Sequence, residues 1–222
     1  MNNIREAVAS VNNEFRQQIL NSGIAKNGFT IDQYTRYLQM QYHLVKDVQK
    51  QFYQIASHPN IFPKNGFRNF LIEFGTEEGP HFRMAERDLK NLDYGIGESP
   101  LDVKLWWCYF DKVVQEKPLM RLGGTCILEN IGSAVGDLVD AAISKTPFLN
   151  KGNTTFLVLH KHEVVNHGDL ILDELEKANL SDDELVDVRG GLDECRPMVL
   201  RIFHWVLYGE ESIPRIDHDS TA

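Results

Sequence analysis

Apolar residues along this chain recur mostly at steps of three and four positions, which is the period of an α-helix. The stretch from Ile31 to Ile55 shows the pattern clearly, because one stripe of the helix collects Tyr34, Leu38, Tyr42, Val45, Val48 and Phe52. Thr30 precedes the stretch and predicts an N-cap, since its hydroxyl can accept a hydrogen bond from an early backbone N–H. His58-Pro59 predicts the end of the run, because the residue before a proline disfavours helical geometry.

The same period predicts helices along most of the remaining chain. Phe67–Phe74 is an apolar helix that is followed by the breakers Gly75, Gly79 and Pro80. Further helices are predicted at about His81–Leu92, Leu101–Glu116, Pro118–Ala142 and Thr154–Ala178, and from the capping box at Ser181–Glu184 to Tyr208. Only short, ambiguous pieces such as Phe156–Leu159 resemble strands. We therefore expect an all-α fold, a single domain over residues 1–222 with about seven or eight helices and a polar tail from about residue 210.

Composition narrows the class of protein. The 222 residues are 42% hydrophobic and 25% charged, which is typical of a folded globular domain. The formal net charge of -9, with no basic patch, argues against nucleic acid as a partner. No apolar run is long enough to cross a membrane, so we expect no membrane partner.

The cysteines and the N-terminus bear on the compartment. Cys108, Cys126 and Cys195 are odd in number and widely spaced, which predicts neither a disulfide framework nor a structural zinc site. Residues Met1 to Arg16 are polar and lack the apolar core of a signal peptide. These features favour the cytoplasm, and a homodimer is the default expectation for a domain of this kind.

A first group of candidate metal ligands lies between Glu73 and His81. Glu73 sits in an otherwise apolar segment, whereas Glu77 and Glu78 come about one turn before His81. The breakers in this segment leave all three glutamates as candidates for the carboxylate ligand. The alternative is a solvated acidic turn at a helix start, where carboxylates suit the helix dipole.

Two later helices carry further candidates. Glu129 stands in an apolar helix that is rich in small residues, where a buried carboxylate needs a cation, a metal or a hydrogen-bond donor. A partner such as Arg121, or a solvent-facing position, is the alternative. His160 and His167 are seven residues apart, about two helical turns, and therefore share a face. The alternative for this pair is a polar helix surface.

Taken together, these residues resemble the motif of the haem-oxygenase-like di-iron oxidases and oxygenases, relatives of the thiaminase-like fold. In that family one helix supplies Glu and His, a second supplies Glu, and a third supplies His-x3-Asp-x2-His. The matching metal-ligand positions are Glu73 (or Glu77 or Glu78), His81, Glu129, His160 and His167, and the resemblance spans roughly residues 34 to 173.

The resemblance implies two irons, with O2 as co-substrate, and oxidation of a small organic substrate in a biosynthetic pathway. An amino-acid derivative or a fatty acid would suit the family. One position departs from the motif, because Val164 stands where the family has its aspartate, and the adjacent Glu163 is rotated by about 100° on an ideal helix. One iron, two irons and a weakly bound second iron therefore stay open.

Two other classes of function remain alternatives. A metal-free thiaminase-like enzyme would use a cysteine nucleophile, for which Cys126 is the candidate, and a haem-binding enzyme on the same fold would need a proximal histidine such as His43. The other class is a helical binding protein without catalysis, which would tolerate changes at Glu129 and His160.

Overall fold

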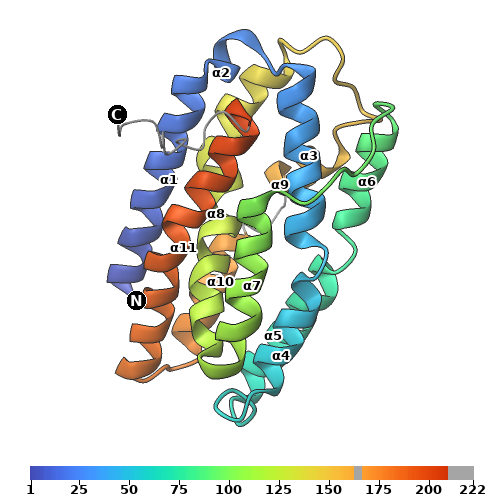
Figure 1. Cartoon of the computed structure of the whole chain (residues 1–222). Helices are drawn as coiled ribbons and strands as arrows, with labels where there is room; N and C mark the ends of the chain where they lie inside the picture. Colours follow the sequence, from blue (N-terminus) through green and yellow to red (C-terminus); the bar gives the residue numbers. More distant parts are fainter. Residues whose placement is uncertain (163–166, 210–222) are drawn as a thin grey trace, which may run out of the picture.

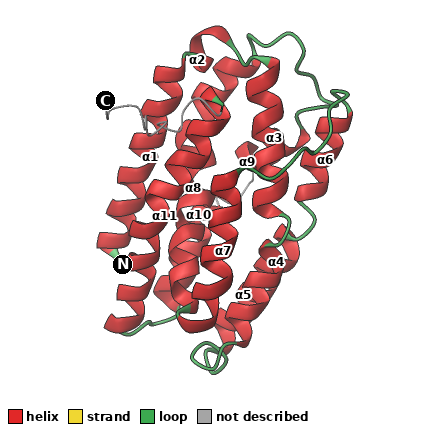
Figure 2. Cartoon of the chain, viewed as in Figure 1, coloured by secondary structure: helices red, strands yellow, loops and turns green. Residues whose placement is uncertain are grey.

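The structure is a computed structural model that describes residues 1–162 and 167–209, without the side chains of residues 160–162. The described residues form eleven helices and no strands (Figures 1 and 2). The helices are α1 Asn2–Ser22, α2 Ile24–Asn27, α3 Ile31–Val45, α4 Val48–Ser57, α5 Asn65–Glu78, α6 Phe82–Lys90, α7 Leu101–Glu116, α8 Pro118–Ile143, α9 Thr155–His162, α10 His167–Lys177 and α11 Asp182–Tyr208. The predicted all-α bundle is confirmed, although it has more helices than the expected seven or eight. The predicted tail from about residue 210 lies outside the described residues.

The helix starts follow from local sequence. Thr30 and Ser181 both form the capping box, in which the hydroxyl accepts from the backbone N–H three residues later and the Gln33 or Glu184 side chain accepts from the cap residue. The predicted helix over Ile31–Ile55 is divided into α3 and α4 at Lys46 and Asp47. That division and the short helix α2 account for part of the difference in helix number.

Helix α8 is the central helix of the bundle (Figure 1). It packs against α1, α2, α7, α10 and α11, and every residue from Pro118 to Ile127 is buried. Gly123 on α8 and Gly191 on α11 allow the two helices to approach closely, since a Cβ added at either position would overlap backbone atoms of the other helix. This contact fixes the position of the residues that α8 contributes to the interior.

A smaller core lies between α3, α6 and α9, away from the main one. Asp88, which is fully buried on α6, accepts hydrogen bonds from the Thr155 hydroxyl and from the Phe156 backbone N–H at 2.8 Å. The carboxylate thereby accepts from a backbone N–H in the first turn of α9, which has no partner within the helix. Among the residues that the structure describes, no helix has both the length and the apolar character that a membrane crossing needs.

Candidate metal centre

Glu78 is the buried carboxylate at the centre of the candidate site. It ends α5, has 3% of its surface exposed and lies between two imidazoles. Its Oε2 is 2.8 Å from Nδ1 of His81, and its Oε1 is 3.1 Å from Nδ1 of His167. The tight turn after α5 brings His81 back towards Glu78, since the His81 backbone N–H donates to the Glu78 carbonyl at 3.1 Å.

Glu129 reaches the same place from α8. Its side chain is 17% exposed, and its Oε2 lies 3.7 Å from Nδ1 of His167. Ligand atoms of Glu78, Glu129 and His167 all lie within 4.8 Å of one another. Carboxylate oxygens and imidazole nitrogens in this number are a donor set that suits iron, manganese or zinc.

His167 is held by its neighbours at the start of α10. Its ring is buried and makes an edge contact with Phe74 on α5, at 5.3 Å between ring centroids. The next residue, Gly168, lies directly against the Asn130 side chain, which a Cβ at position 168 would overlap. This close approach of α10 to α8 places His167 beside Glu129.

The structure places the predicted glutamates differently from one another. Glu73 is exposed and does not join the cluster, so of the three glutamates that the sequence leaves open, Glu78 is the one that lies in it. The reason is helical geometry: α5 continues through Gly75 to Glu78, so Glu73 lies roughly 140° around the helix from Glu78. Glu77 lies at the edge of the cluster, where its side chain is 62% exposed and its Oε1 is 3.7 Å from Nε2 of His167.

The predicted histidines fall into two groups. His81 and His167 are both buried and both contact Glu78. The backbone of His160 belongs to α9, but its side chain lies outside the described residues, as do Glu163 and Val164. The complete set of five ligands therefore stays a prediction.

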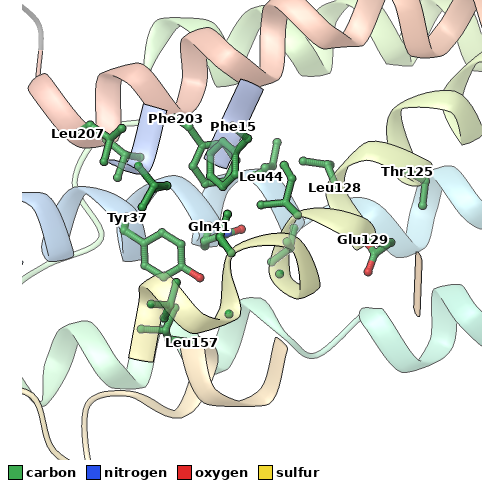
Figure 3. Close-up of a pocket in the computed structure, with 18 of the residues that line it drawn as sticks. Phe15, Tyr37, Gln41, Leu44, Thr125, Leu128, Glu129, Leu157, Phe203 and Leu207 are labelled. Atoms are coloured by element: carbon green, nitrogen blue, oxygen red, sulfur yellow. The ribbon is translucent and has the colours of Figure 1, made fainter. Parts of the chain in front are cut away.

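An apolar cavity of about 140 Å³ adjoins the two carboxylates (Figure 3). Glu78 and Glu129 line it together with side chains from α1, α3, α8, α9 and α11, which include Phe15, Leu44, Val135, Leu157, Phe203 and Leu207. Figure 3 shows the Tyr37 and Gln41 side chains on the α3 side of the cavity, with Glu129 and Thr125 further along. A concave apolar site with a few polar groups is the usual form of a small-molecule site.

Arg121 is a functional candidate that sequence reasoning considered only as a partner for Glu129. It lines the cavity, is 1% exposed and donates to Gln51 Oε1 at 2.6 Å and Thr125 Oγ1 at 2.7 Å. Within the described ranges it forms no ion pair with Glu129 or any other carboxylate within 4.0 Å. Burial lowers the pKa of Arg121 to about 10.

The residues of the two alternative enzyme classes lie elsewhere. Cys126 is fully buried in α8, and burial raises the pKa of its thiol to about 12. The His43 Nε2 lies 3.2 Å from the Gly97 carbonyl oxygen. Neither side chain lines the cavity.

No protein-family model and no curated protein matches this sequence. The structure is similar to a crystal structure of a domain of unknown function with a haem oxygenase-like fold from Shewanella denitrificans OS217. That match has a TM-score of 0.79 and covers 100% of this chain and 97% of that chain at 16% sequence identity. The similarity assigns the haem oxygenase-like fold to this chain, in agreement with the sequence prediction.

Proposed function

We propose that this protein is a non-haem iron oxidase or oxygenase that activates O2 to oxidise a small organic substrate. The proposed ligands are Glu78, His81, Glu129, His160 and His167, with Glu78 in place of Glu73. The resemblance in sequence motif implies two irons. The iron would supply the O2 chemistry, whereas the protein supplies ligands, orientation and an enclosed cavity.

The convergence of Glu78, Glu129 and His167 beside an apolar cavity carries this proposal. Burying two carboxylates together is costly unless positive charge or hydrogen-bond donors compensate them. A divalent cation satisfies that need with the donor atoms already in place. Helical bundles build iron sites in this way, from side chains on several facing helices.

The protein groups have separable roles in this proposal. Glu78 on α5 and Glu129 on α8 would hold the metal together with His167 on α10. His81 contacts the second oxygen of Glu78 and thereby orients that carboxylate. The apolar lining keeps bulk water away from the site, so a bound substrate meets the metal in a low-dielectric environment.

Iron content tests the proposal. Protein expressed with supplied iron, or reconstituted anaerobically, is expected to contain close to two irons per chain by elemental analysis, with no Soret band in its visible spectrum. Glu78→Ala and Glu129→Ala are expected to lose most of this iron while keeping the far-UV circular dichroism of the helical fold. Glu73→Ala is the matched control, because it removes an exposed carboxylate from the same helix as Glu78.

Three results would contradict the proposal. Wild-type protein without iron after anaerobic reconstitution would exclude an iron enzyme. Full iron content in both Glu78→Ala and Glu129→Ala would move the metal to other residues. Equal iron loss in Glu73→Ala and Glu78→Ala would show that surface carboxylates, and not the buried cluster, bind the iron.

A further inference from the structure

Arg121 is a buried cation in the middle of the bundle. The guanidinium carbon lies 5.0 Å from the ring centroid of Phe110, 5.5 Å from that of Trp106 and 6.0 Å from that of Phe52. Aromatic faces stabilise a cation but do not neutralise it. A fully buried arginine normally has a carboxylate or phosphate partner.

The hydrogen bonds of Arg121 leave part of its donor capacity unused by the protein. Nε donates to Gln51 and Nη1 donates to Thr125, which accounts for two of the five N–H groups of a guanidinium. Among the acceptors that the structure describes, which leave out the side chains of residues 160–162, the other three N–H groups have no partner. The side chain of Gln51 in turn donates to Asp111 at 3.2 Å, so the guanidinium is held in a fixed orientation.

Arg121 is the first of the α8 residues that line the cavity. Arg121, Thr125 and Glu129 follow one another at intervals of four residues on α8, roughly 6 Å apart along the helix axis. All three line the cavity, which continues past Glu129 to Gly132, Val135 and other apolar positions. A ligand held at Arg121 would therefore pass the candidate metal centre before its remainder reaches the apolar end.

We infer that Arg121 binds the carboxylate of an apolar monocarboxylic acid, whose hydrocarbon part occupies the cavity along α8. The planar guanidinium matches a carboxylate, which can accept two parallel N–H bonds. A phosphate is a poorer match, because its second charge would face Glu78 and Glu129. That this acid is the substrate rests on the proposed iron chemistry, whereas its binding at Arg121 does not.

The cavity also sets the size and polarity of the acid. Its volume of about 140 Å³ is close to that of a cavity of roughly 150 Å³ that accepts benzene, so a hydrocarbon part of about six carbons fits. A second negative charge would face Glu78 and Glu129 or be buried among apolar side chains without a partner, which selects against dicarboxylic acids. Hexanoate and benzoate represent the expected class, and hexanamide and benzamide are their neutral counterparts.

Calorimetric titration of metal-free protein tests the inference, because it separates acid binding from iron chemistry. Wild-type protein is expected to bind each acid at least tenfold more tightly than its amide. Arg121→Gln is expected to weaken acid binding by tenfold or more and amide binding by less than threefold. Arg121→Lys keeps the charge without the planar fork and is expected to fall between the two. Arg196→Gln, at an exposed arginine outside the cavity, is the matched control and leaves both affinities unchanged.

Three outcomes decide the matter. Equal affinity of the wild type for acid and amide overturns the inference without any variant. Unchanged acid affinity in Arg121→Gln, with a native circular dichroism spectrum, also overturns it. Selective acid binding by a protein that takes up no iron supports the Arg121 site and refutes the proposed oxidase, so the two proposals fail separately.

Discussion

Replacing Arg121 by methionine measures what the buried charge does for the fold. The pKa of about 10, against 12.5 for an ordinary arginine, corresponds to roughly 3 kcal/mol against the charged form at neutral pH. Methionine removes this cost and keeps an unbranched side chain that packs against Phe52, Trp106 and Phe110.

The same substitution also removes stabilising contacts. Gln51 Oε1 loses its donor in a fully buried position, which costs about 1–3 kcal/mol, and the aromatic contacts of the cation contribute about 1 kcal/mol more. These losses are similar in size to the gain. We therefore expect the free energy of unfolding of Arg121→Met to lie within about 2 kcal/mol of the wild type.

Urea unfolding of metal-free protein, followed by far-UV circular dichroism, measures this difference. Gln51→Met is the companion variant, because it removes the acceptor and leaves the charge buried, and it should destabilise the protein more than Arg121→Met does. A loss above about 4 kcal/mol in Arg121→Met would refute the reasoning, since a loss of that size is typical of breaking a buried ion pair. Arg121 would then be a structural cation, not one kept for a ligand.

Three further predictions test other parts of the molecule. Gly191→Ala should lower the free energy of unfolding by about 3 kcal/mol or more, because its Cβ would overlap the α8 backbone. Gly190→Ala is the control and should be neutral or stabilising by up to about 1 kcal/mol, because its Cβ would have no neighbour nearer than 3.7 Å. Thermal denaturation measures both variants. The Arg16 guanidinium lowers the pKa of Asp137 to about 2. This pair therefore stabilises the fold above the ordinary aspartate pKa of 3.8, and its contribution is lost as the pH falls towards 2. Arg16→Gln should reduce the dependence of stability on pH in that window, measured by acid titration at low salt. Cys126 should resist iodoacetamide at pH 8 in native protein and react after unfolding in urea, because it is buried and burial raises the pKa of its thiol. Cys126→Ala should keep the wild-type iron content. Rapid labelling of Cys126 in native protein would favour the alternative of a cysteine nucleophile.

Most of the fold was predictable because helical periodicity and capping residues are local properties of the sequence. The predicted Leu101–Glu116 helix is α7, and the capping boxes at Thr30 and Ser181 are present. Helix α1 was not predicted, although Ile4, Val8, Val11, Phe15 and Ile19 are spaced three or four apart and all become buried. Frequent asparagine and glutamine residues made this segment look polar, whereas the spacing of its five large apolar residues carried the helical signal.

The candidate site was only partly predictable, because it depends on how helices meet. Residue type and spacing predict Glu129, His81 and His167 as ligands, and the structure brings all three to Glu78. The sequence leaves Glu73, Glu77 and Glu78 open, because the breakers Gly75, Gly79 and Pro80 do not show whether the helix continues through Gly75 to Glu78. The direction in which α5 presents its residues depends on its packing partners α4 and α10, which no local pattern specifies.

The role of Arg121 could not be predicted from the sequence. A single charged residue within the run Pro118–Ile127 is a local sign of an unusual buried position, but the sequence suggests a neighbouring acidic group as its partner. The hydrogen bonds to Gln51 and Thr125, and the absence of a carboxylate within 4.0 Å among the described residues, depend on three-dimensional contacts. Because of those contacts, we interpret Arg121 as a candidate binding group and not as a structural counter-ion.

The central helix α8 connects the two proposals, because one rigid element carries both Arg121 and Glu129. Their separation of eight residues corresponds to roughly 12 Å between backbone positions, and the Arg121 guanidinium donates to Thr125, which lies between them on α8. A carboxylate bound at Arg121 would therefore place the carbons a few bonds away from it, and not the carboxyl group itself, beside Glu78 and Glu129. Under the proposed iron chemistry, oxidation is therefore expected within the hydrocarbon chain near the carboxylate, with the far end of the chain among Val135 and its apolar neighbours.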